Sequence, residues 1–121
     1  MRKFCVMTSI IVLMMISLAW ASGSVTQTIS GAPPATGTWT SAIAPLYKGN
    51  GFLNVSVYGA VWSATVWLQR SFDKGVSWFD VMSFTVNSQK ALIDQEGGVR
   101  YRMGVKSGGY SSGSVAVRLS N

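Results

Sequence analysis

The stretch SFDKGVSW, from Ser71 to Trp78, decides how this chain is expected to fold. It has the form S-x-D-x-G-x-x-W with strand-like sequence on both sides, which is the Asp-box pattern of a β-hairpin. We expect Asp73 to accept hydrogen bonds from N–H groups of the turn. Gly75 supplies the positive φ that the turn needs, and Trp78 begins the return strand and packs back over the hairpin. The pattern specifies a fold element and no chemistry.

The chain on both sides of this hairpin alternates between apolar and polar residues. From Trp39 onward, turn signals recur roughly every eight to twelve residues, which is typical of short antiparallel strands. About seven such strands predict an all-β fold, a single antiparallel β-sandwich or jelly-roll-like domain. On the return strand we expect one apolar face, formed by Trp78, Met82, Phe84 and Val86.

The first residues read as an export signal. Arg2 and Lys3 precede an apolar run from Phe4 to Leu18, and the following AWA matches a cleavage pattern that makes Ser22 the mature start. We therefore interpret residues 1–21 as a signal peptide. Two alternatives stay open: an uncleaved hydrophobic anchor, slightly short of the ~18 residues of a membrane span, or a segment retained for assembly.

The rest of the chain divides into two parts. Residues 22–38 are rich in Ser, Thr, Gly, Ala and Pro and predict a flexible arm or linker, in which residues 25–29 could add one short strand. Residues 39–121 form the β-sandwich domain.

The charge of the chain favours anionic partners only in a general way. Ten basic and four acidic residues give a formal net charge of +6, and removal of residues 1–21 would leave eight and four, or +4. Such a charge attracts anionic surfaces. No run of adjacent basic residues indicates a nucleic-acid-binding arm, so we expect no specific nucleic acid partner.

Most catalytic chemistry is excluded by composition. The chain has no histidine, and its sole cysteine, Cys5, lies in the expected signal. Histidine bases, thiol catalysis and structural zinc are therefore absent. Asp94 and Glu96 could bind calcium with nearby carbonyls, although a solvated loop that pairs with Arg100 or Lys90 is the favoured interpretation. We expect no catalytic residues, no cofactor, no metal and no enzyme activity.

The best binding candidates are basic and aromatic side chains. If the last two strands pair with each other, one sheet face gathers Arg100, Arg102, Lys106 and Arg118. Such a stripe could contact an anionic glycan, an envelope or a capsid surface, and the competing interpretation is an ordinary solvent face. Trp67, with Tyr110 or another aromatic residue, could form a sugar-stacking platform or a subunit contact.

Four segments stand in a recognisable order and spacing: residues 51–57, 66–78, 96–102 and 112–120. Over about 70 residues they resemble small β-sandwich proteins encoded by tailed bacteriophages and prophages. The resemblance implies a virion-associated structural protein, such as a head decoration or accessory piece, that acts through contacts with capsid subunits or with its own copies. It implies no catalytic residues.

Two functions are therefore expected from different classes. The first is a non-enzymatic assembly protein of a phage-like particle, located in the virion. The alternative is a periplasmic or secreted β-sandwich module that recognises glycan or cell envelope after signal cleavage. In either case a membrane is contacted only through the N-terminal segment, if that segment is not cleaved.

Overall fold

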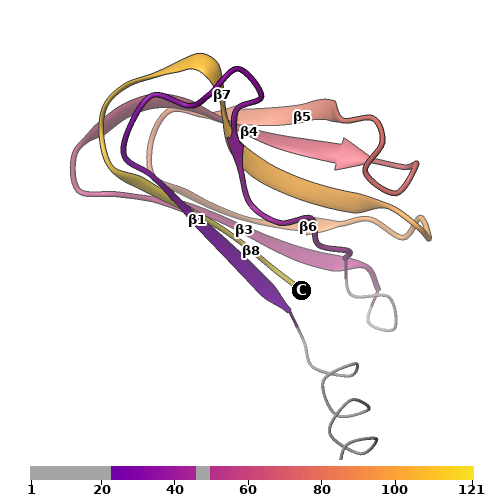
Figure 1. Ribbon diagram of the computed structural model, residues 1–121. Coiled ribbons are helices and arrows are strands. Elements are labelled where there is room, and N and C mark those ends of the chain that lie inside the picture. Colours follow the sequence, from indigo (N-terminus) through magenta and orange to yellow (C-terminus); the bar gives the residue numbers. More distant parts are fainter. Residues whose placement is uncertain (1–22, 46–49) are drawn as a thin grey trace, which may run out of the picture.

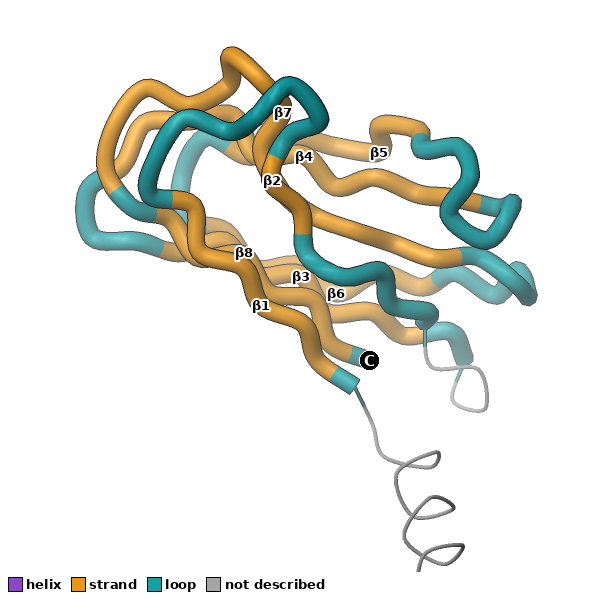
Figure 2. The backbone as a smooth tube through the Cα atoms, viewed as in Figure 1, coloured by secondary structure: helices purple, strands orange, loops and turns teal. Residues whose placement is uncertain are grey.

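Two antiparallel β-sheets face each other in the computed structural model of this protein, which describes residues 23–45 and 50–121 (Figures 1 and 2). The predicted all-β sandwich is confirmed, and no described residue is helical. The described part contains eight strands instead of about seven. They are β1 (Ser24–Ile29), β2 (Thr38–Trp39), β3 (Phe52–Tyr58), β4 (Trp62–Ser71), β5 (Phe79–Phe84), β6 (Ser88–Ile93), β7 (Arg100–Gly113) and β8 (Val115–Ser120).

Each sheet has four strands. Sheet A has the order β1-β8-β3-β6, and sheet B has the order β2-β7-β4-β5. All pairings are antiparallel. Among the described strands, only β4 and β5 are both consecutive in the chain and paired in one sheet, so the hairpin at residues 71–78 belongs to sheet B. The other described strands are each followed by a strand of the opposite sheet.

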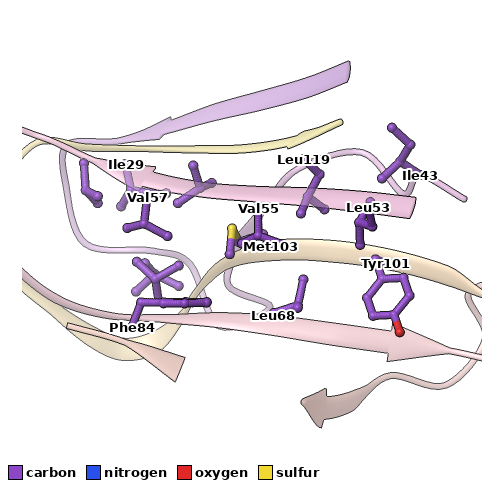
Figure 3. Close-up of a cluster of buried hydrophobic side chains, with 14 of the residues drawn as sticks. Ile29, Ile43, Leu53, Val55, Val57, Leu68, Phe84, Tyr101, Met103 and Leu119 are labelled. Atoms are coloured by element: carbon purple, nitrogen blue, oxygen red, sulfur yellow. The ribbon is translucent and has the colours of Figure 1, made fainter. Parts of the chain in front are cut away.

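The core lies between the sheets because side chains of a strand point alternately to its two faces. In β3, Leu53, Val55 and Val57 are at most 1% exposed, while their neighbours point outward. Figure 3 shows these side chains directed toward Leu68 and Met103 of sheet B. The apolar face predicted for the last strands is present as well, with its buried members at Val99, Tyr101, Met103, Val105, Val115, Val117 and Leu119.

The short strand that the sequence allows at residues 25–29 of the predicted arm, residues 22–38, is present, so this part of the arm belongs to the sandwich. Ser24–Ile29 pairs with β8 along its whole length, and Ile29 is 2% exposed in the core. The pairing covers an edge of β8 that would otherwise present unpaired N–H and C=O groups. The sandwich therefore begins at Ser24, before the predicted boundary at Trp39.

The last two strands do not pair with each other. β7 pairs with β4 in sheet B, whereas β8 pairs with β1 and β3 in sheet A. The chain crosses between the sheets at Gly113, which has a φ of 80° and lies so close to β4 that a Cβ would overlap the Val61 carbonyl oxygen. The four predicted basic residues are therefore divided between two opposite faces.

The return strand after the hairpin changes face at a β-bulge. Leu68 pairs with Met82 and Gln69 with Asp80, so Val81 is an extra residue in β5. An extra residue inverts the alternation of the side chains before it. The predicted apolar face is thus wrong at Trp78, which lies on the outer side of sheet B. It is also wrong at Val86, which follows the end of β5 and is 66% exposed.

The expected signal peptide or anchor, residues 1–21, lies outside the described residues. In residues 23–45 and 50–121, no helix has the length and apolarity required to cross a membrane.

Candidate interaction surface

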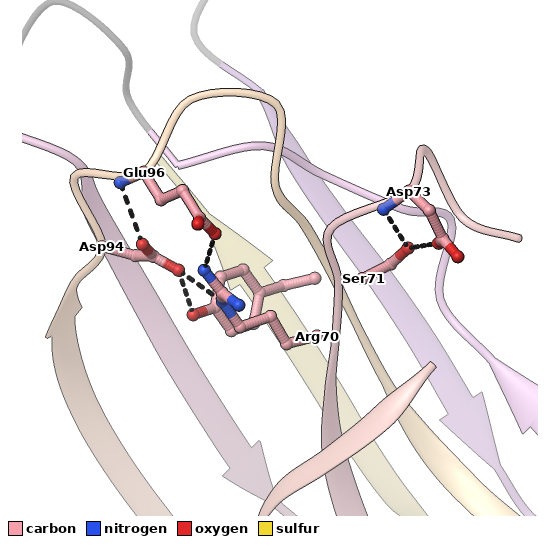
Figure 4. A network of polar contacts seen from close by, with 6 residues as sticks. Arg70, Ser71, Asp73, Asp94 and Glu96 are labelled. Carbon is pink, nitrogen blue, oxygen red and sulfur yellow. Dashed lines mark hydrogen bonds and ion pairs between the residues drawn. The ribbon is translucent and has the colours of Figure 1, made fainter. Parts of the chain in front are cut away.

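The Asp-box turn is held by side-chain hydrogen bonds around Ser71 and Asp73 (Figure 4). Asp73 Oδ1 accepts from the N–H of Ser77 at 2.9 Å and from Ser71 Oγ at 2.7 Å. Ser71 Oγ in turn accepts from the N–H of Gly75 at 2.8 Å. The turn residues Lys74 and Gly75 have φ values of 61° and 88°. Hydrogen bonds from Ser77 and Ser71 hold the pKa of Asp73 below its usual range, so its carboxylate acts as a structural acceptor.

The outer face of sheet B gathers three tryptophans together with basic and polar side chains, and we call it the tryptophan face. Trp39 pairs with Gly104, and Trp67 lies between two core residues of β4, so both side chains point away from the core. The bulge adds Trp78 and Asp80 to the same face. Its members are Trp39, Trp67, Gln69, Trp78, Asp80, Arg100, Arg102 and Lys106.

Arg102 lies between two indole rings of this face. Its Cζ is 4.2 Å from the ring centroid of Trp39 and 4.4 Å from that of Trp78. A guanidinium at such distances is attracted by the negative faces of the rings. Desolvation between them lowers the pKa of Arg102, although an arginine keeps its charge at any ordinary pH.

Gln69 links Arg102, through Asp80, to a second cation–π contact, the one between Lys106 and Trp67. Its Oε1 accepts from Arg102 Nε, and its Nε2 donates to Asp80 Oδ1, each at 2.9 Å. Lys106 Nζ donates to Asp80 Oδ2 at 2.6 Å and lies 4.4 Å from the ring centroid of Trp67. Hydrogen bonds from Lys106 and Gln69 lower the pKa of Asp80. A continuous row of contacts therefore crosses all four strands of sheet B, with a cation over each of the three indoles.

The structure brings some predicted site residues together and separates others. Arg100, Arg102, Lys106 and Trp67 share the tryptophan face. Arg118 lies on the outer side of sheet A, between Thr26 and Ser56. Tyr110 packs against the core and donates its hydroxyl to the Gly113 carbonyl at 2.8 Å.

Sequence reasoning named neither Trp39 nor Asp80 as a member of the tryptophan face, and it assigned Trp78 to the apolar face. Trp39 belongs to a strand of two residues, which is too short for an alternation signal. Gln69 lies on this face by the alternation of β4, two residues after Trp67, whereas Asp80 joins it through the bulge in β5. A hydrogen bond between the two strands joins them. No local pattern in the sequence indicates these contacts.

The candidate calcium ligands form an ion-pair cluster instead (Figure 4). Asp94 Oδ2 accepts from Arg70 Nε at 2.8 Å and from the Tyr101 hydroxyl at 2.6 Å, and Glu96 pairs with Arg70 Nη2. Burial opposes ionisation of Asp94, but the hydrogen bonds from Arg70 and Tyr101 outweigh it and lower the pKa. The predicted partners Arg100 and Lys90 are not used.

The carboxylates of Asp94 and Glu96 are engaged in ion pairs and hydrogen bonds within this cluster. Arg70 pairs with both acids, and its own pKa is raised, chiefly by the hydrogen bond with Asp94. Burial and the hydrogen bond to Asp94 raise the pKa of Tyr101 to about 12. Among the described residues, no group of three or more His, Cys, Asp or Glu side chains is placed to hold a metal ion.

Comparisons of the chain with protein-family models, with curated proteins and with solved structures found no match.

Proposed function

We propose that this chain is a non-enzymatic assembly protein that acts by contacts with other protein subunits, as a head decoration or accessory protein of a phage-like particle. The observation that carries the proposal is the use of every carboxylate by the fold. All four acidic residues of the chain lie in the described part, and each has a structural partner. The resemblance of residues 51–121 to phage-encoded sandwich proteins is the reason that we propose a phage-like particle as the assembly.

The protonation states of these acids also speak against acid–base catalysis. A general acid or base works best with a pKa near the operating pH, which requires a raised value in a carboxyl group. The pKa values of Asp73, Asp80 and Asp94 are lowered instead. These three carboxylates therefore remain charged and hydrogen-bonded at neutral pH, as structural carboxylates do. The chain also has no histidine that could act as a base.

The surface is suited to protein contacts. Phe72 and Phe79, at the end of the β4–β5 hairpin, stack with centroids 5.3 Å apart, and both rings are more than half exposed. Aromatic residues and arginine are enriched in the centres of protein interfaces. The tryptophan face supplies both kinds of residue on a rigid sheet, and the Phe72–Phe79 pair adds exposed aromatic surface at the end of the hairpin.

The free sheet edges offer a second kind of contact. Within the described part, β5 and β6 each pair on one side only. An edge strand presents backbone N–H and C=O groups to which another chain can add. Assembly proteins can therefore use these edges together with side-chain contacts.

The native mass of the chain tests the proposal. We would fractionate cells that express the full chain with its neighbouring genes, and measure sedimentation and intact mass of each fraction. We expect the chain in large particles, together with other structural subunits. A chain found only as a free monomer, in a fraction without such subunits, would contradict the proposal.

One observation favours a second function, an exported module that binds glycan or cell envelope. The signal-like sequence of residues 1–21 is unusual for a virion protein, because virions normally assemble in the cytoplasm. The same fractionation separates the two functions. A chain that begins at Ser22 and is recovered outside the cytoplasm, bound to envelope polysaccharide, would support the module.

A further inference from the structure

We propose that the Trp39–Arg102–Trp78 stack is a docking site for an acidic segment of a partner protein, whose carboxylate group pairs with the guanidinium of Arg102. This inference rests on the proposed function, because it takes the partner to be a protein. It adds the surface, the central residue and the chemistry of the partner.

The first argument is the free end of Arg102. Its Nε donates to Gln69, while Nη1 and Nη2 make no hydrogen bond within the described residues. No buried side-chain nitrogen or oxygen lacks a partner there, so both Nη groups reach solvent. Gln69 and the two indoles hold the guanidinium in place, and its open edge has the two parallel donors that a carboxylate accepts.

The second argument is that the chain has no carboxylate side chain to place there. All four acids are occupied elsewhere, by the Asp-box turn, by Lys106 or by Arg70. A cation that is partly desolvated between two rings gains more from an anion than a fully hydrated one. Arg100, two residues away on the same side of β7, is exposed and has no ion pair in the described part, so a second positive charge lies at the rim.

Charge and geometry select the occupant. A second copy of this chain would bring a net charge of +6 and no free carboxylate side chain, so an acidic partner of another sequence fits better. A cation already covers one face of each tryptophan on this surface, which leaves less indole area on which a sugar could stack. Tryptophan and arginine are the residues that most often dominate protein interfaces.

The test is a titration of the full-length, isotope-labelled chain with a capped oligoglutamate peptide, followed by NMR. The probes are the Nε–H of Arg102 and the indole N–H groups of Trp39 and Trp78. We expect shifts at these three groups, and no shifts with the matching oligoglutamine peptide. Polygalacturonate and inorganic phosphate, tested in parallel, identify a uronate or phosphate source of the anion.

Two variants of equal net charge separate a specific site from general attraction. Arg102→Gln should weaken peptide binding about tenfold or more, since a charge-assisted hydrogen bond is lost, whereas Arg118→Gln on the opposite face should leave it within about twofold. Arg102→Lys keeps the charge and loses the paired donors, so it should bind nearly as weakly as Arg102→Gln. Thermal unfolding of each variant shows that it is folded.

Equal weakening by Arg102→Gln and Arg118→Gln would overturn the proposal, as would tighter binding of polygalacturonate or phosphate than of oligoglutamate. Absence of peptide binding by the wild-type chain would also overturn it. None of these results depends on particle assembly. A chain that binds oligoglutamate at Arg102 but never enters a particle would contradict the proposed function and leave the docking site standing.

Discussion

Replacement of Ser71 by alanine tests whether the Asp-box organises the β4–β5 hairpin. Ser71 is fully buried, and its Oγ is both acceptor and donor in the turn: it accepts from the Gly75 N–H at 2.8 Å and donates to Asp73 Oδ1 at 2.7 Å. Ser71→Ala removes both contacts, and also the longer hydrogen bond that Oγ accepts from the Asp73 N–H at 3.4 Å, without adding volume. The Gly75 N–H then has no protein acceptor, and Asp73 keeps only the hydrogen bond from Ser77.

The expected loss follows from the unpaired donor. A buried donor left without a partner costs about 1–3 kcal/mol, and because Gly75 is only partly buried we expect the lower part of that range, about 1–2 kcal/mol. For a domain of this size, each kcal/mol lowers Tm by about 4–8 °C. Ser71→Ala should therefore unfold clearly earlier than the wild type.

Thermal and urea unfolding measure this loss, and amide hydrogen exchange locates it. The amide of Gly75 should exchange faster in Ser71→Ala, while amides in the middle of β7 should change only through global stability. Ser112→Ala, an exposed serine in β7, is the matched control and should leave Tm nearly unchanged. Equal Tm values for the two variants, or an unchanged Gly75 exchange rate, would show that Ser71 is not part of the turn's support.

Three further predictions concern pH and close packing. The pKa values of Asp73, Asp80 and Asp94 are lowered in the folded chain. The stabilisation that these ionised carboxylates give is therefore present above about pH 4 and is lost as pH falls through their folded pKa values. Tm measured down to about pH 2 should decline in that range, and a flat profile would contradict the hydrogen bonds to these carboxylates. Tyr101 gives a pH dependence in the opposite direction, because its pKa is raised to about 12 in the folded chain. The free energy of unfolding should therefore fall as pH rises from about 10 to 12. Unfolding followed against pH should show a less steep fall in Tyr101→Phe than in wild type. A Cβ at Gly104 would overlap the Thr38 carbonyl oxygen, so Gly104→Ala should detach β2, lower Tm and expose Trp39 to fluorescence quenchers, whereas Gly97→Ala, in open space, should do neither.

The bulge at Val81 illustrates why the site was less predictable than the fold. Strict alternation assigned Trp78 to the apolar face of the return strand, and one inserted residue moved it to the opposite face. A bulge has no reliable local signature, because it depends on how two strands match in length and twist. The cross-strand partners Gln69 and Asp80 follow from that match as well.

The order of amino acids alone predicts the all-β class, the Asp-box hairpin, and most of the residues that line the core. These features follow from short-range rules: the alternation of side chains along a strand, and the few residues that a tight turn accepts. The folded chain is needed to identify the partners of each strand, the place of residues 24–29 in sheet A, and the crossing at Gly113 that sends Arg118 to the opposite face. Those outcomes depend on contacts between residues far apart in the chain. The stacking of Trp39, Arg102 and Trp78, which come from three separate segments, is one of them.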